Sequence, residues 1–193
     1  MTAQPTQRRL LTVAEYAELP EDDGTRYELM EGALVMSPSA IPRHQRCLRV
    51  LMFQMVPQLP NVEILQEVDV DLELAPSDRP GTVRIPDLVV VSRDAYRRVD
   101  AEGGLLRASE VLLAVEVFSP GSERRDSRVK HDEYADAGIG HYWMIDLEDG
   151  PSLVACHLAG RFGYVNAEPV RSRFTTTDPF PVEIDLDALV DRG

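Results

Sequence analysis

Two short stretches, residues 84–91 (RIPDLVVV) and 111–118 (VLLAVEVF), are nearly continuous apolar runs, yet each contains one acidic residue. Apolar runs of this length are typical of central β-strands that are covered on both faces. A carboxylate in such a strand is costly to remove from water unless a cation or a hydrogen-bond donor contacts it. Any fold of this chain must therefore bury both strands and place a cation or a hydrogen-bond donor beside Asp87 and Glu116.

Helical signals occur in four other segments. Thr12 is a candidate cap with Glu15 three residues later, and Gly138 is a candidate stop for a helix that Ser122 could cap. Between Arg43 and Leu59, apolar side chains recur at helical spacing and define one buried face. We expect helices over residues 12–20, 43–59, 122–138 and, as an acidic closing helix, 185–191.

The remaining patterns predict strands. Residues 62–74 alternate between apolar and acidic residues, as a half-exposed antiparallel strand does, and residues 26–37 reverse direction around Gly32. We expect strands or hairpins over residues 26–37, 62–74, 84–91, 111–118, 141–146 and 153–167. This order predicts an α/β (α+β) fold, with a mixed central sheet flanked by helices, an N-terminal ribbon and a C-terminal hairpin, and not a doubly wound nucleotide-binding fold. Because the sequence contains no internal repeat or obvious linker, we expect one domain over residues 1–193, with its core at about 43–146.

The composition of the chain disfavours several classes of function. The chain has 33 acidic and 20 basic residues, a net charge of −13, which disfavours tight non-specific binding of nucleic acid, although a local basic stripe can persist on an acidic protein. Two cysteines, Cys47 and Cys156, form neither a disulfide framework nor a zinc site. No apolar run reaches the roughly 18 residues of a membrane span, and the first residues lack the core of a signal peptide. We expect a soluble, cytoplasmic protein that does not enter a membrane.

The two buried acids suggest a metal site. Adjacent strands can bring Asp87 and Glu116 onto one hard cation such as Mg²⁺ or Mn²⁺, which prefers oxygen ligands. The alternative is that each carboxylate points from a strand end into water or pairs with an arginine.

The basic residues comprise 19 arginines and one lysine, Lys130. The eight residues from Ser122 to Lys130 rise by roughly 12 Å in a helix, and the strand from Glu116 to the turn covers about 7–10 Å. A helix packed back along that strand therefore brings Lys130 level with Glu116. Asp126, Lys130 and Tyr134 share one helix face, so a simple surface pair of Asp126 with Lys130 is the alternative.

Asp87 after a proline, with Glu116 in an apolar strand 29 positions later, is similar to the PD-(D/E)xK nuclease superfamily, which has the restriction-endonuclease-like fold. The whole chain from about residue 10 to 190 resembles the Uma-two family, described as restriction-endonuclease-like proteins of unknown function. The resemblance rests on an ordered series of segments: RYELMEG, His44 at the start of a helix, RIPDLVVV, VEVFSPGS, the spaced Asp126, Lys130 and Tyr134, and GIGHYWMID.

This resemblance implies a metal-dependent endonuclease that hydrolyses phosphodiester bonds of DNA. In the superfamily the lysine lies two positions after the second acid, where this chain has Phe118, so the resemblance implies that Lys130 in the next helix replaces it. It also implies that Asp87, Glu116 and the backbone carbonyl of Val117 hold Mg²⁺ or Mn²⁺. Lys130 would then stabilise the attacking hydroxide or the charge that builds on phosphorus.

Further residues are candidates for the same site. Glu28 is a candidate extra acid, with an exposed strand carboxylate as the alternative, and His44, Asp126 and Tyr134 are candidate accessory residues, with helix capping or core packing as the alternative for His44. Two arginine sets could contact phosphates or form salt bridges on a solvated face. These sets are Arg43, Arg46 and Arg49, and Arg124, Arg125 and Arg128.

A second interpretation keeps the fold without the chemistry. The net charge favours a catalytically weak or inactive protein that serves as a binding or homodimeric assembly module, whereas the intact set of Asp87, Glu116 and Lys130 favours the enzyme. We expect a homodimer. No zinc finger or recognition-helix motif predicts sequence-specific reading, and an RNA substrate is as compatible with the sequence as DNA.

Overall fold

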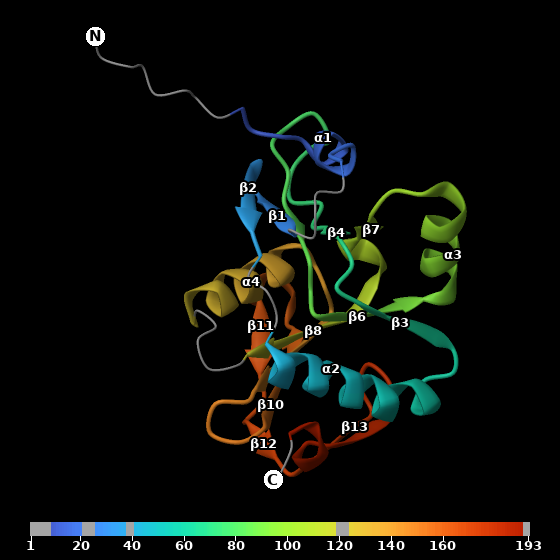
Figure 1. Ribbon diagram of the computed structural model, residues 1–193, viewed down its shortest axis with the longest axis vertical. Coiled ribbons are helices and arrows are strands. Elements are labelled where there is room, and N and C mark those ends of the chain that lie inside the picture. Colours follow the sequence, from blue (N-terminus) through green and yellow to red (C-terminus); the bar gives the residue numbers. More distant parts are fainter. Residues whose placement is uncertain (1–8, 21–25, 38–40, 119–123, 191–193) are drawn as a thin grey trace.

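The computed structural model describes residues 9–20, 26–37, 41–118 and 124–190, and of residues 124–127 only the helical backbone. A seven-stranded mixed sheet lies at its centre (Figure 1). Its pairs are antiparallel except for the parallel pair β8–β9. Its path runs through β11 (Tyr164–Asn166), β10 (Ser152–Leu158), β9 (His141–Asp146), β8 (Val111–Phe118), β6 (Leu88–Ser92) and β3 (Val62–Gln66), and β12 (Val170–Arg171) pairs with β10.

A second, five-stranded sheet begins with the N-terminal hairpin. Glu31 and Gly32 both have positive φ, as a two-residue hairpin turn requires. The strand order is β2 (Ala33–Met36), β1 (Tyr27–Met30), β5 (Val83–Arg84), β4 (Val70–Asp71) and β7 (Leu106–Arg107). A separate pair near the C-terminus contains β13 (Arg173–Thr176) and β14 (Val182–Asp185).

Helices cover both faces of the larger sheet. The α-helices of the described residues are α1 (Val13–Ala17), α2 (Pro42–Met55), α3 (Arg93–Glu102) and α4 (Arg124–Asp136). Short 3₁₀ turns are η1 (Val56–Gln58), η2 (Ala108–Glu110), η3 (Gly160–Phe162) and η4 (Asp187–Leu189). The predicted capping of the first helix is confirmed, because the Glu15 N–H donates to Thr12 Oγ1 and the Thr12 N–H donates to the Glu15 carboxylate. Within the described residues, no helix has the length and apolarity to cross a membrane.

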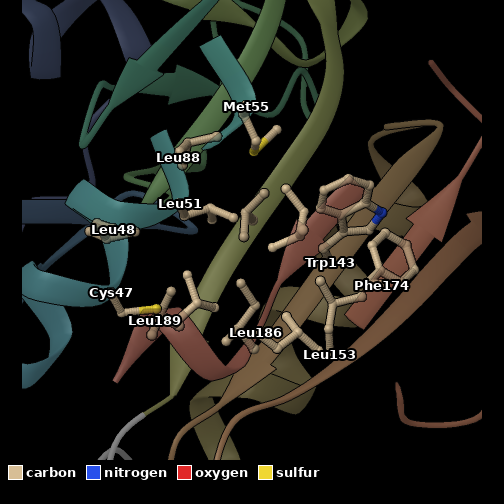
Figure 2. Close-up of a cluster of buried hydrophobic side chains, with 14 of the residues drawn as sticks. Cys47, Leu48, Leu51, Met55, Leu88, Trp143, Leu153, Phe174, Leu186 and Leu189 are labelled. Atoms are coloured by element: carbon tan, nitrogen blue, oxygen red, sulfur yellow. The ribbon is translucent and has the colours of Figure 1, made fainter. Parts of the chain in front are cut away.

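The alternation of side chains along the central strands forms two apolar clusters. On one face, Leu48, Leu51 and Met55 of α2 join buried residues of β6, β8 and β9, and Trp143 packs edge-on against Phe174 with ring centroids 5.0 Å apart (Figure 2). On the other face, Tyr134 of α4 and Ala95 of α3 pack against the remaining residues of these strands. The predicted mixed sheet with helices on its faces is therefore confirmed.

Three expected elements differ from the structure. The expected strand 62–74 is divided between the two sheets, because Glu67 has a φ of 51° and turns the chain from β3 towards β4. The expected strand 84–91 is likewise divided into β5 and β6. The expected helix at 185–191 is wrong, since β14 extends to Asp185 and only the turn η4 follows.

One helix was not expected. Its signals were Ser92, which caps α3 by accepting from the Ala95 N–H, and the acidic Asp94 in the first turn.

The core on the α2 face yields a stability prediction. Leu51→Ala is expected to lower the free energy of unfolding by about 2–5 kcal/mol, because the leucine is fully buried among the strands of the sheet. Phe53→Ala on the same helix, 73% exposed, is expected to change it by less than about 0.5 kcal/mol. Urea denaturation measures both, and equal losses would contradict the packing of α2 described here.

Candidate active site

The two predicted acids face each other across neighbouring strands. β6 and β8 pair antiparallel with Leu88 opposite Val115, and this register continued by one residue sets Asp87 opposite Glu116. Directly opposed residues project from the same face of a sheet, with side chains close enough to interact. The Val117 N–H donates to Asp87 Oδ2 at 2.6 Å, which ties the carboxylate to β8.

Glu116 is 5% exposed, and its contacts come from α4. Lys130 Nζ donates to Glu116 Oε1 at 3.0 Å, and the Tyr134 hydroxyl donates to the same oxygen at 2.8 Å. Burial is the main cause that raises the pKa of Glu116, to about 7. The charge of Lys130 opposes this rise, and the charge of Asp87 adds to it. Lys130 thus lies beside Glu116, at the place the helix length predicts.

Glu28 of β1 also lies in this cluster. Its Oε1 is 3.1 Å from Lys130 Nζ and accepts from the Ile85 N–H at 3.0 Å. Burial acts to raise the pKa of Glu28, but Lys130, the Ile85 N–H and Arg84 together lower it below its usual range. The ammonium of Lys130 therefore bridges one carboxylate from each of the two large sheets.

Two residues that sequence reasoning missed complete the cluster. Arg84 of β5 is 1% exposed and donates to Glu28 Oε2 at 2.9 Å. Its Nε and Nη2 also donate to both carboxylate oxygens of Glu133 on α4, at 2.7 and 2.9 Å. The available signals were a charged residue at the head of a buried run and the spacing of Glu133 three residues after Lys130, which puts both on one helix face.

His44 lies in the first turn of α2 and contacts the other acid. Its Nε2 is 3.0 Å from Asp87 Oδ1, and both side chains are partly buried. Burial acts to lower the pKa of His44, but the hydrogen bond and charge of Asp87 outweigh it, so that the pKa is raised. His44 therefore orients the Asp87 carboxylate together with the Val117 N–H.

The remaining candidates are only partly accounted for. Tyr134 contacts Glu116, as above, but the side chains of Asp126, Arg124 and Arg125 lie outside the described residues. Arg128 on α4 is exposed. On α2, Arg49 is exposed, and Arg43 and Arg46 are partly buried.

A family comparison becomes informative once these contacts are known. A family model described as "Putative restriction endonuclease", Uma2, matches residues 13–188. The chain belongs to the Uma2 family.

Solved structures agree on the fold. The chain is similar to a crystal structure from Anabaena variabilis described as "a putative nuclease belonging to DUF820", with a TM-score of 0.70 and 14% sequence identity. The similarity covers 93% of this chain and 97% of that one. The predicted restriction-endonuclease-like fold is thereby confirmed. A search of curated proteins finds no match.

A hollow of about 400 Å³ beside α3 is not the candidate site of this Uma2 protein. None of the predicted site residues lines it, and its wall includes the acidic residues Glu67, Asp69 and Asp100. An acidic wall repels a polyanion such as nucleic acid.

The donor set at Asp87 and Glu116 fits a hard divalent cation. Among the described residues, no group of three or more His, Cys, Asp or Glu side chains could hold a metal ion. A cation here would therefore use two carboxylates, a backbone carbonyl and water, a set that Mg²⁺ accepts. Charge balance points the same way, since four ionised carboxylates exceed two cations by two negative charges. These groups are Glu28, Asp87, Glu116 and Glu133, with Arg84 and Lys130. A proton on Glu116, whose pKa is about 7, or on His44 lowers this excess by one each.

The buried arginine yields the prediction for this site. Arg84→Met is expected to lower the free energy of unfolding by about 3–5 kcal/mol, because Glu28 and Glu133 would lose the cation that they share. Arg98→Met removes a comparable two-bond pair with Glu110 in a more exposed place and is expected to cost less. Denaturant titration of both variants tests this order, and a more stable Arg84→Met protein would contradict it.

Proposed function

We propose that this Uma2 protein is a divalent-metal-dependent endonuclease that hydrolyses phosphodiester bonds of DNA. The observation that supports it most is the convergence of three side chains from separate segments. Asp87, which directly precedes β6, is bonded to the Val117 N–H next to Glu116, and Lys130 Nζ is 3.0 Å from Glu116. This combination of two carboxylates and one ammonium suits the binding of a cation and of a phosphate.

Asp87, Glu116 and the carbonyl of Val117 would hold Mg²⁺ or Mn²⁺. The β6–β8 register, continued by two residues, sets Val117 opposite Pro86, which has no N–H to donate to that carbonyl. Pro86 therefore cannot donate to the Val117 carbonyl. When bound, such a cation polarises the phosphate and lowers the pKa of a bound water towards neutrality.

The chain's own groups contribute charge and orientation. Lys130 supplies a compact positive charge for the phosphate in the transition state, and its contacts with Glu28 and Glu116 fix where that charge lies. His44 and the Val117 N–H hold the Asp87 carboxylate in one orientation. Tyr134 and Lys130 share Glu116 Oε1, so both hold this carboxylate in place.

Several finer features belong to the same proposal. Arg49 and Arg128 are exposed on α2 and α4 and would contact phosphates, which gives local affinity on a chain of net charge −13. Residues 1–193 would act as one domain, because both large sheets contribute to one cluster of charges. We further propose a cytoplasmic homodimer.

A catalytically inactive assembly module is the second candidate. The contacts that favour it are those of Lys130 and Tyr134, which already hold Glu116 Oε1 without a metal ion. In that case, the charge cluster would only fasten α4 to the sheets.

Cleavage of a supercoiled plasmid in the presence of Mn²⁺ or Mg²⁺ tests the enzyme. Asp87→Asn is expected to reduce the rate by about 100-fold or more, because it removes a charged ligand worth several kcal/mol of charge stabilisation. Asp94→Asn, the same change at an exposed position of α3, is the matched control. Equal rates for wild type and Asp87→Asn would contradict the proposal, as would a folded wild type that cleaves neither DNA nor RNA.

Lys130→Gln distinguishes the two candidates. The enzyme predicts a fall in cleavage of roughly 10²–10³-fold in protein that circular dichroism shows to be folded. If the protein is an inactive assembly module, Lys130→Gln is expected to lower stability, and neither the wild type nor the variant is expected to cleave DNA. Undiminished cleavage by the folded Lys130→Gln variant would show that Lys130 takes no part in the reaction.

A further inference from the structure

The strand β2 is an open edge made of apolar residues. It ends the five-stranded sheet, and all four of its residues are exposed. The other edge strands of the two large sheets each contain at least one buried or partly buried residue; they are β7, β11, β12 and β3. Figure 1 shows β2 in the upper left part of the molecule, beside β1 and above α4. Edge strands of stable monomers are normally protected by charge, proline or a covering segment, and residues 33–36 contain neither a charged residue nor a proline.

Apolar side chains gather around this edge. Leu34, Val35 and Met36 are exposed, as is Met30 in the adjacent strand. Leu10 is exposed beside the hairpin turn at Gly32, and Ile41 is exposed at the start of α2. These six residues are between 37% and 63% exposed. Leu34 and Met36 project from one face of β2 and Val35 from the other, so apolar side chains lie on both sides of the open edge.

The backbone of β2 determines how a partner strand would pair. Val35 lies opposite Glu28 in β1, and the Ser37 N–H donates to the Arg26 carbonyl. Because N–H and C=O groups alternate in direction along a strand, those of Leu34 and Met36 point away from β1. Gly32 cannot extend this open row, since its N–H and carbonyl are bonded to Gly81 and Leu11.

Among two-fold pairings of β2 with itself, one register uses all four open groups. With Val35 on the two-fold axis, Leu34 pairs with Met36 of the second copy and Met36 with Leu34, which forms four hydrogen bonds. An axis at Leu34 or at Met36 forms two hydrogen bonds between residues of β2. The favoured register also places Val35 against its own counterpart and leucine against methionine, so that apolar side chains meet in the three central pairs, while Ala33 lies opposite Ser37 of the second copy.

Self-complementarity argues for a second copy as the occupant, because a second β2 offers the open backbone groups and apolar side chains that match those of the first. The net charge of −13 opposes association of two copies, but the uncharged residues 33–37 add no local repulsion at this strand. The chain's own residues 1–8, MTAQPTQR, are mostly polar and include a proline, which makes them poorly suited to pair along an apolar strand.

We propose that β2 pairs with β2 of a second copy, antiparallel and with Val35 on the two-fold axis, to form one continuous sheet in a homodimer. Three strand spacings then separate Glu28 from Glu28 of the second copy, about 14 Å. On the proposed function, on which this consequence rests, two cleavage sites related by a two-fold axis would lie side by side, one for each strand of a duplex.

Disulfide trapping tests the register. Val35→Cys is expected to form a disulfide-linked dimer on mild oxidation, because opposed residues in a non-hydrogen-bonded pair have Cα atoms about 4.5 Å apart. Leu34→Cys is the matched control, since its two copies would be offset along the strands and beyond the reach of a disulfide. The native Cys47 and Cys156 are buried. Equal trapping of the two variants on non-reducing gels, or no trapping of Val35→Cys, would overturn the register.

Sedimentation tests the interface without relying on cysteine. Wild type is expected to be a dimer and Val35→Lys a monomer, while Val165→Lys, at an exposed position of the edge strand β11, stays dimeric. A monomeric wild type, or a dimer that Val35→Lys leaves intact, would overturn the interface. Neither result depends on nuclease activity, so an inactive protein that dimerises through β2 would count against the proposed function alone.

Discussion

The burial of Glu116 in a central strand is the constraint on which the site depends. β8 is covered on both faces, and a carboxylate in its interior is tolerated only with partners that replace water. α4 supplies these partners as Lys130 and Tyr134, which contact the same carboxylate oxygen. The position of α4 over the sheet is thereby coupled to one acidic residue. The removal of that acid would take from the buried ammonium of Lys130 one of its carboxylate partners.

A second cation extends this coupling to the smaller sheet. Arg84 contacts Glu28 of β1 and Glu133 of α4, so the five-stranded sheet, α4 and the seven-stranded sheet meet at one group of charges. Buried ion pairs of this kind do not maximise stability, because desolvation offsets much of the Coulomb attraction. On the proposed function, their presence is explained by a need to keep a lysine and two carboxylates close together.

The sequence predicted the central elements well, because their patterns are strong. β8 and β9 have the bounds expected from their apolar runs, and the distance along strand and helix placed Lys130 beside Glu116. The features that the sequence did not predict have specific structural causes. The chain turns at Glu67 into a second sheet through a positive φ that glutamate rarely adopts. The Arg84–Glu133 pair joins residues 49 positions apart, and no periodicity reveals such a contact.

Calorimetric titration with Mn²⁺ tests the central claim most directly, that Asp87 and Glu116 form a cation site. We predict that the folded wild type binds one ion per chain. We predict that Glu116→Gln, checked by circular dichroism, loses this binding, whereas Asp94→Asn retains it. A folded wild type that binds no ion at millimolar Mn²⁺, or a Glu116→Gln protein that binds as the wild type does, would contradict the claim.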